Sequence, residues 1–267
     1  QEDRRAGSEL PDEEPRRRAP IRGHDATTEA AYLTRERRPG GFPTVDGEFK
    51  YHGTAPNARA MKGVMLMSGG IDSPVALYYM LRQRHEMIAV HMDNRPFTDD
   101  SPLEKVVDHL ALLRSRFGQP IPLYVLPHGP TQVRLMRGTD RHVGCVLCRR
   151  FMWRSAARIA EREGAGFLTT GEALGQVASQ TLANMRSATI AVGLPIVRPL
   201  IGLDKQEIES EARALGTYTI STRPGVCCQA VPPKPATRSS ILQIEAEEAP
   251  LDVESIVDDV VRRAVVM

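Results

Sequence analysis

The chain has 267 residues, with 35 Lys and Arg against 33 Asp and Glu and a formal net charge of +2. This length allows one or two domains with a sizeable core, and the balanced charge does not by itself indicate a nucleic-acid partner. No apolar stretch approaches the roughly 20 residues that cross a bilayer, and no signal-peptide pattern opens the sequence. We therefore expect a cytoplasmic protein without membrane contact.

Residues 1–60 differ in composition from the rest of the chain. They mix Asp-Glu runs with Arg runs, contain many Pro and Gly, and hold few aliphatic side chains. Such a segment cannot bury enough apolar surface to offset the entropy of ordering, so we predict a disordered or surface-draped tail. A folded domain is expected over 61–248. A C-terminal amphipathic helix is expected within 249–267, with its apolar face over 251–265.

Strand and helix signals alternate from Lys62 onward. The predicted elements are a strand at 63–67, a helix at 74–81, strands at 88–92 and 122–127, helices at 103–116 and 149–163, a strand at 167–170, and a helix at 205–215 that Gly216 closes. This alternation predicts an α/β fold with a doubly wound parallel sheet, covered by helices on both faces. Ligands of such folds bind at the carboxyl ends of the strands.

A glycine-rich turn, Ser68-Gly69-Gly70-Ile71-Asp72-Ser73, follows the first buried strand and leads directly into a helix. Successive backbone N–H groups and the helix N-terminus would point at one spot, which suits a phosphate group. Asp72 would repel that phosphate unless Mg²⁺ lay between them, so the turn predicts a Mg–nucleotide site. The alternative is a tight strand-to-helix turn that binds nothing.

Two later stretches also follow strand ends. Residues 170–180 hold two glycines and two glutamines and would form a loop beside a ligand, or a plain loop that caps a helix. Lys205 falls in the first turn of a predicted helix, where cations are disfavoured. It would therefore meet an anion there, or else be an ordinary solvated lysine.

Four stretches together resemble the tRNA 4-thiouridine synthetases, the ThiI family of PP-loop ATP pyrophosphatases. They are S-G-G-I-D-S-P-V-A, T-G-E-A-L-G-Q-V-A-S-Q-T-L, R-P-L-I-G-L-D-K-x-E-I and I-E-A-E-E, and they span about 62–255 in the same order. The resemblance implies the adenine nucleotide alpha-hydrolase-like fold. It also implies an ATP-dependent tRNA sulfurtransferase, which adenylates the uridine at position 8 of tRNA before sulfur displaces AMP.

The resemblance further implies which residues meet the nucleotide. Asp72 would hold Mg²⁺ and act in catalysis. The other implied ATP-binding positions are Met67, Ser68, Gly69, Gly70, Ser73, His91, Gly171, Gln180 and Lys205. The implied partners are tRNA, a sulfur donor in the form of free sulfide or a persulfide protein, and a second copy in a homodimer.

Two domains of longer family members have no counterpart in this sequence. Residues 1–60 are too short for the ferredoxin-like and THUMP domains that grip tRNA, and no rhodanese domain follows the last motif. We therefore expect a short archaeal-like form with a separate THUMP-type RNA-binding partner. The rival hypotheses are thiolation of another tRNA base and a non-catalytic tRNA-binding or sulfur-carrier subunit.

Four cysteines are too few for a disulfide scaffold in a chain of this length and indicate metal or redox chemistry. Family members without a rhodanese carry C-x-x-C plus a later cysteine. That pattern implies a 4Fe–4S cluster on Cys145, Cys148 and Cys228, with Cys227 as the alternative third ligand. A structural zinc on all four cysteines, a persulfide on a catalytic Cys228 with a C-x-x-C partner, and ordinary buried thiols stay open.

The helix that follows the C-x-x-C pair is rich in arginine. Its N-terminus, with Arg149 and Arg150, would lower the pKa of the neighbouring thiols. Arg150, Arg154 and Arg158 share one helix face, which could follow RNA phosphates or simply be solvated. Trp153 is expected in the core rather than stacked on a base.

Overall fold

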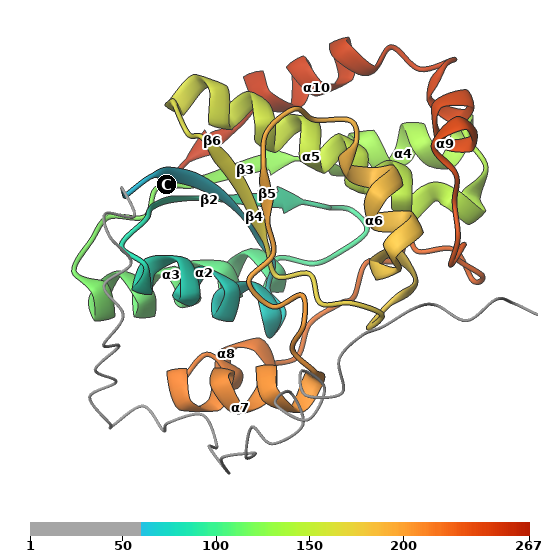
Figure 1. Ribbon diagram of the computed structural model, residues 1–267. Coiled ribbons are helices and arrows are strands. Elements are labelled where there is room, and N and C mark those ends of the chain that lie inside the picture. Colours follow the sequence, from blue (N-terminus) through green and yellow to red (C-terminus); the bar gives the residue numbers. More distant parts are fainter. Residues whose placement is uncertain (1–59) are drawn as a thin grey trace, which may run out of the picture. The chain divides into compact units, whose positions relative to one another are not determined.

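The computed structural model describes residues 60–267, so the tail expected over 1–60 lies almost wholly outside the described residues. Within this range six strands form one sheet in the order β5-β4-β1-β2-β3-β6 (Figure 1). The strands are β1 (Lys62–Met67), β2 (Glu86–Asp93), β3 (Leu123–Pro127), β4 (Phe167–Thr170), β5 (Ile196–Val197) and β6 (Val265–Val266). Every pair is parallel except β3–β6, which confirms the predicted parallel sheet.

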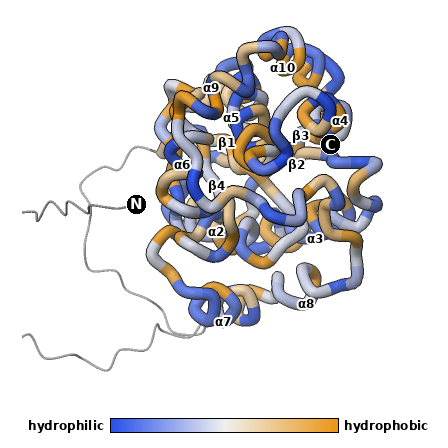
Figure 2. Tube along the Cα trace, turned by 90° about the vertical axis from the view of Figure 1, so that its right-hand side faces the viewer, coloured by the Kyte–Doolittle hydropathy of each residue, from blue (hydrophilic) through white to orange (hydrophobic). Residues whose placement is uncertain are grey.

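Helices cover both faces of this sheet, as Figure 2 shows from the side. One face carries α2 (Asp72–Arg82), α3 (Ser101–Phe117), α7 (Lys205–Leu215) and α8 (Tyr218–Ser221). The other carries α4 (Gly129–Gly138), α5 (Gly144–Glu163), α6 (Leu182–Thr189), α9 (Ile241–Glu248) and α10 (Val253–Arg262). Successive residues of a strand point to opposite faces of the sheet, so each face has its own apolar core. Val64 packs in the core beneath α5 and α10, and Met65 packs in the core beneath α2 and α3. The doubly wound prediction is therefore confirmed.

The C-terminus differs from the prediction. The helix expected to reach residue 265 ends at Arg262, and Val265–Val266 pairs with β3 as an antiparallel edge strand instead. Two β-branched residues suit this pairing, since β3 would otherwise end the sheet with an open edge. Helix α10 packs on α5 through Ile256, Val257 and Val260. Among the described residues, no helix has both the length and the apolar character needed to cross a membrane.

The arginine stripe on α5 is largely internal, which corrects the expectation of an RNA-facing or solvated row. Arg150 Nε and Arg154 Nη1 both donate to Glu248 Oε1, at 2.9 and 2.6 Å. Burial alone would raise the pKa of Glu248, but these hydrogen bonds hold it below its ordinary value. Arg158 pairs with Glu254 of α10. Trp153 is 1% exposed, so its predicted core position is confirmed.

Candidate functional site

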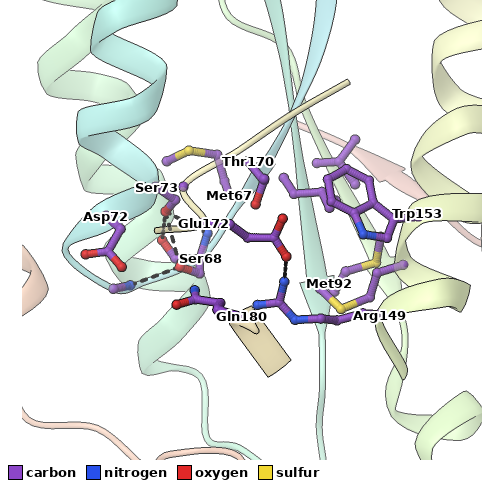
Figure 3. A pocket seen from close by; sticks show the side chains of 15 residues that line it. Met67, Ser68, Asp72, Ser73, Met92, Arg149, Trp153, Thr170, Glu172 and Gln180 are labelled. Atoms are coloured by element: carbon purple, nitrogen blue, oxygen red, sulfur yellow. Dashed lines mark hydrogen bonds and ion pairs between the residues drawn. The ribbon is translucent and has the colours of Figure 1, made fainter. Parts of the chain in front are cut away.

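A cavity of about 160 Å³ opens at the carboxyl ends of β1 and β4 (Figure 3). We call it the turn cavity. Its lining includes Met67, Ser68, Gly70, Asp72, Ser73, Arg149, Met152, Trp153, Thr170, Gly171, Glu172 and Gln180. The structure thus brings the glycine-rich turn and the 170–180 stretch to one place, as expected for ligand-binding loops at one edge of a parallel sheet.

Side-chain hydrogen bonds from Ser73 fix the shape of the turn. Its Oγ accepts from Ser68 N at 3.0 Å and donates to Ser68 O at 2.9 Å, which ties the start of α2 to the end of β1. Gly70 N donates to Ser68 Oγ at 3.3 Å. A Cβ on Gly69 would lie 3.0 Å from Pro102 Cα, so the turn also packs closely on the first turn of α3.

Gly171 allows the segment after β4 to touch this turn. A Cβ at this position would lie 2.7 Å from Ser73 N and 2.8 Å from the carbonyl carbon of Asp72. Backbone atoms cannot give way as a flexible side chain can, so only glycine fits this approach. Gly171 therefore sets the distance between the two halves of the turn cavity.

Of the remaining predicted nucleotide residues, three lie outside the cavity lining. They are Gly69, His91 and Lys205. His91 is buried, and its Nδ1 lies 3.1 Å from Met67 O, so it supports the end of β1. Lys205 is exposed in the first turn of α7. Its charge partly opposes the effect of burial, which raises the pKa of Asp72.

A second cavity, of about 300 Å³, holds three of the four cysteines. Cys145, Cys148 and Cys228 line it together, whereas Cys227 is exposed and lies outside the lining. We call it the thiol cavity. Arg149 and Met152 line both cavities, so the two adjoin at the first turns of α5.

Burial disfavours the thiolate form of Cys145 and Cys148. Burial raises the pKa of Cys148 to about 12, and it also raises the pKa of Cys145. This corrects the expectation that the helix N-terminus and the arginines would lower these values: desolvation of the thiolate outweighs both. Buried His128 is neutral, with a pKa lowered to about 4, and its Nε2 lies 3.2 Å from Cys148 Sγ.

Gln132 of α4 connects the C-x-x-C pair to the later cysteine. Its Nε2 lies 3.6 Å from Cys148 Sγ and 3.7 Å from Cys228 Sγ, and it also donates to Asn94 Oδ1 at 3.0 Å. Within residues 60–267, no group of three or more His, Cys, Asp or Glu side chains is arranged to hold a metal ion. Cys145, Cys148 and Cys228 share the thiol cavity without forming such a group. Cys227 lies outside the cavity lining, so the four cysteines do not face one point as a zinc on all four would require.

The last turn of α8 also contacts the glycine-rich turn. Ser221 Oγ lies 3.2 Å from Gly70 O and 3.1 Å from Nε2 of His109, which is fully buried. Burial lowers the pKa of His109 to about 4, so the imidazole is neutral. This hydrogen bond to Gly70 O fixes the plane of the peptide between Gly70 and Ile71. Because the peptide is planar and trans, the N–H of Ile71 points away from Ser221.

Several site residues were not found from the sequence. Ser221 and His109 carry no motif, and Gln132 lies in a segment for which no element was predicted. Glu172 appeared in the sequence only within the motif at 170–180, and Arg149 only as a cation beside the C-x-x-C pair, so their pairing was not predicted. Their proximity depends on the pairing of β1 with β4 and on the crossing of α5 over β1.

The chain is similar to known proteins in sequence and fold. A family model described as "Thiamine biosynthesis protein (ThiI)" matches residues 59–253. The probable tRNA sulfurtransferase of Methanosarcina mazei is 39% identical over 216 residues, covering 80% of this chain and 53% of that protein. That of Bacillus subtilis is 37% identical over 222 residues, covering 82% and 55%. A solved structure of a 4-thiouridine synthetase–RNA complex with bound ATP is 37% identical, with a TM-score of 0.75, covering 78% of this chain and 55% of that one.

The matched residues 59–253 include all four motifs and every residue that lines the two cavities. The chain spans about half the length of the curated relatives that it matches. The resemblance seen in the sequence is thereby confirmed over the folded part, and the chain belongs to the ThiI family.

Proposed function

We propose that this chain carries the nucleotide-activating and sulfur-inserting domain of a tRNA sulfurtransferase, which converts the uridine at position 8 of tRNA to 4-thiouridine with ATP. One observation carries the proposal: the turn cavity and the thiol cavity share Arg149 and Met152 as lining. An activated base could therefore meet ATP and sulfur without moving between sites. Relatives named tRNA sulfurtransferase, and a relative solved with RNA and ATP, agree with it.

In the first half-reaction, uridine O4 attacks the α-phosphorus of ATP and pyrophosphate leaves toward the glycine-rich turn. Backbone N–H groups and the N-terminus of α2 favour negative charge there. Asp72 would hold Mg²⁺, which neutralises charge on the departing pyrophosphate. The remaining nucleotide contacts would come from Met67, Ser68, Gly69, Gly70, Ser73, Gly171 and Gln180, with His91 behind Met67 and Lys205 toward the outer phosphates.

In the second half-reaction, sulfur enters from the thiol cavity. Cys145, Cys148 and Cys228 would hold a 4Fe–4S cluster, which when bound supplies an iron without a protein ligand where sulfide can sit. Gln132 keeps Cys148 and Cys228 facing one another. The alternative uses no cluster: the outer sulfur of a persulfide on Cys228 would attack C4 and expel AMP, which leaves a disulfide between Cys228 and the base. A C-x-x-C thiol would then attack Cys228 Sγ, which releases 4-thiouridine and forms a disulfide between the two cysteines.

The tRNA is gripped elsewhere in this proposal, since Arg150 and Arg154 are engaged by Glu248. A THUMP-type domain or partner would supply the grip, and free sulfide or a persulfide protein would supply sulfur. A cytoplasmic location and a homodimer belong to the same proposal.

The test is a reaction of the full chain with unmodified tRNA, ATP, Mg²⁺ and sulfide under exclusion of oxygen. We expect pyrophosphate and AMP in equal amounts, only when tRNA is present, and 4-thiouridine in the digested RNA by mass spectrometry. Thiolation of a different base would replace the proposed substrate. Absence of pyrophosphate would favour the non-catalytic subunit.

Replacing Ser221 with Ala should weaken ATP binding without stopping the chemistry. The variant loses the hydrogen bond to Gly70 O, which orients the glycine-rich turn. One such bond corresponds to about 1 kcal/mol, so we expect the KM for ATP to rise about fivefold with little change in kcat. Pyrophosphate release at varied ATP measures both constants.

Thr222→Ala is the matched control for this variant. Its Oγ1 donates to Tyr218 O at 2.9 Å, and within residues 60–267 its side chain makes no hydrogen bond to the turn. An unchanged KM in Ser221→Ala, or an equal rise in Thr222→Ala, would show that Ser221 does not position the turn.

A further inference from the structure

Two arginines share one buried carboxylate in the wall of the turn cavity. Glu172 is 1% exposed, and it pairs with Arg149 Nη1 (Figure 3) and with Arg198 Nε at 2.8 Å. Within residues 60–267 no second carboxylate pairs with either arginine. The group therefore carries one positive charge in excess. Burial lowers the pKa of both arginines, as expected for cations whose charge is incompletely compensated.

Of the two arginines that pair with Glu172, Arg149 alone faces the cavities. Arg149 lines the turn cavity and the thiol cavity, whereas Arg198 lines neither. Helix α5 places Arg149 directly after Cys148, and Glu172 holds its guanidinium at the boundary. A purely structural ion pair would need one arginine for one carboxylate. Here the second arginine satisfies Glu172 and leaves Arg149 able to attract an anion in either cavity.

We propose that Arg149 is a catalytic residue of the second half-reaction, where it stabilises the negative charge that passes from the sulfur to AMP, and that Glu172 is its positioning residue. This inference rests on the proposed function. Hydrosulfide attacks C4 of the adenylated uridine, and a carbon–sulfur bond forms. The bond between C4 and O4 then breaks, and its electron pair leaves on the oxygen of AMP. The hydrosulfide proton passes to ring N3, so one negative charge moves from the thiol cavity to the turn cavity.

The position of Arg149 suits this transfer. A cation fixed at the boundary of both cavities lies near the negative charge while it is on the hydrosulfide and after it has moved to AMP. The guanidinium therefore needs little reorientation during the step. The first half-reaction moves charge toward the glycine-rich turn instead, where Asp72 and backbone N–H groups lie. The two half-reactions should therefore depend on Arg149 to different degrees.

Arg149→Met separates them, because it removes the charge and keeps an unbranched side chain. In a single turnover with tRNA, γ-labelled ATP reports pyrophosphate and α-labelled ATP reports adenylated tRNA and AMP. We expect pyrophosphate release within about threefold of the unmodified protein. AMP release after sulfide is added should slow about 10²-fold, and adenylated tRNA should accumulate. Arg149→Lys restores a positive charge and should recover AMP release at least about tenfold. Iron content is measured on each variant, so that altered cluster loading is not mistaken for lost charge.

Arg198→Met is the matched control. It removes the other arginine that pairs with Glu172, and Arg198 lines neither cavity. It should not accumulate adenylated tRNA. Equal slowing of both steps in Arg149→Met, or equal accumulation in Arg198→Met, would overturn the inference in favour of a structural network.

If Arg149→Met does not fold, Glu172→Gln takes its place. Adenylated tRNA should accumulate in this variant, and its absence would count against the inference. Failure of the unmodified protein to release pyrophosphate would remove the proposed function and this inference together, whereas normal thiolation by Arg149→Met would remove the inference alone.

Discussion

Asp72→Asn is expected to lower tRNA-dependent pyrophosphate release by at least about 10³-fold, which corresponds to about 4 kcal/mol of transition-state stabilisation. Asp72 and Glu172 are the carboxylates that line the turn cavity, and Glu172 is engaged by two arginines. Asn keeps the shape of the side chain but removes the charge that would bind Mg²⁺. Initial rates at saturating ATP, measured over a range of Mg²⁺ concentrations, test this expectation.

Asp252→Asn is the control for Asp72→Asn. Asp252 caps α10, where its side chain accepts from Ser255 N, and Asn is an equally good cap. This control should leave pyrophosphate release unchanged. Normal release by Asp72→Asn would contradict the adenylation step at the glycine-rich turn. A loss that extra Mg²⁺ restores would still place the metal at Asp72, with weakened affinity.

The sequence was sufficient for the four strands β1 to β4 and for bringing the glycine-rich turn close to the 170–180 stretch, but not for the edge strands β5 and β6. Strand β1, the turn at 68–73 and helix α2 are adjacent in the chain, so local patterns predict both the turn and its position at a strand end. Gly171 could be placed near them because it follows another strand of the same parallel sheet. The position of a site residue can thus be predicted from the sequence when its neighbours in the fold are also its neighbours along the chain.

Contacts across the fold were not predictable in this way. Glu248 lies 98 residues from Arg150 in sequence, so the arginine stripe gave no sign that a buried carboxylate covers it. The pKa of Cys148 was misjudged because the arginines were visible in the sequence and the burial was not. Cys227 and Cys228 are adjacent and chemically identical, and only the path of their loop shows which one lines the thiol cavity.

Cys228→Ser is expected to release pyrophosphate at the unmodified rate, to accumulate adenylated tRNA, and to lose at least about 10³-fold in 4-thiouridine formation. Both routes to sulfur use Cys228, either as a cluster ligand or as the persulfide carrier, and neither uses it before adenylation. Nucleoside mass spectrometry and a pyrophosphate assay on the same reaction separate the two half-reactions.

Cys227→Ser is the matched control, because Cys227 is exposed and lies outside the thiol cavity. It should thiolate normally, and a loss equal to that of Cys228→Ser would reverse the assignment of the third thiol.

The iron content of protein purified without oxygen decides between the cluster route and the persulfide route. About four irons per chain, lost in both Cys145→Ala and Cys228→Ser, would establish the cluster. Iron-free protein that still thiolates would instead require a persulfide on Cys228, because no other thiol that lines the cavity lies outside the C-x-x-C pair.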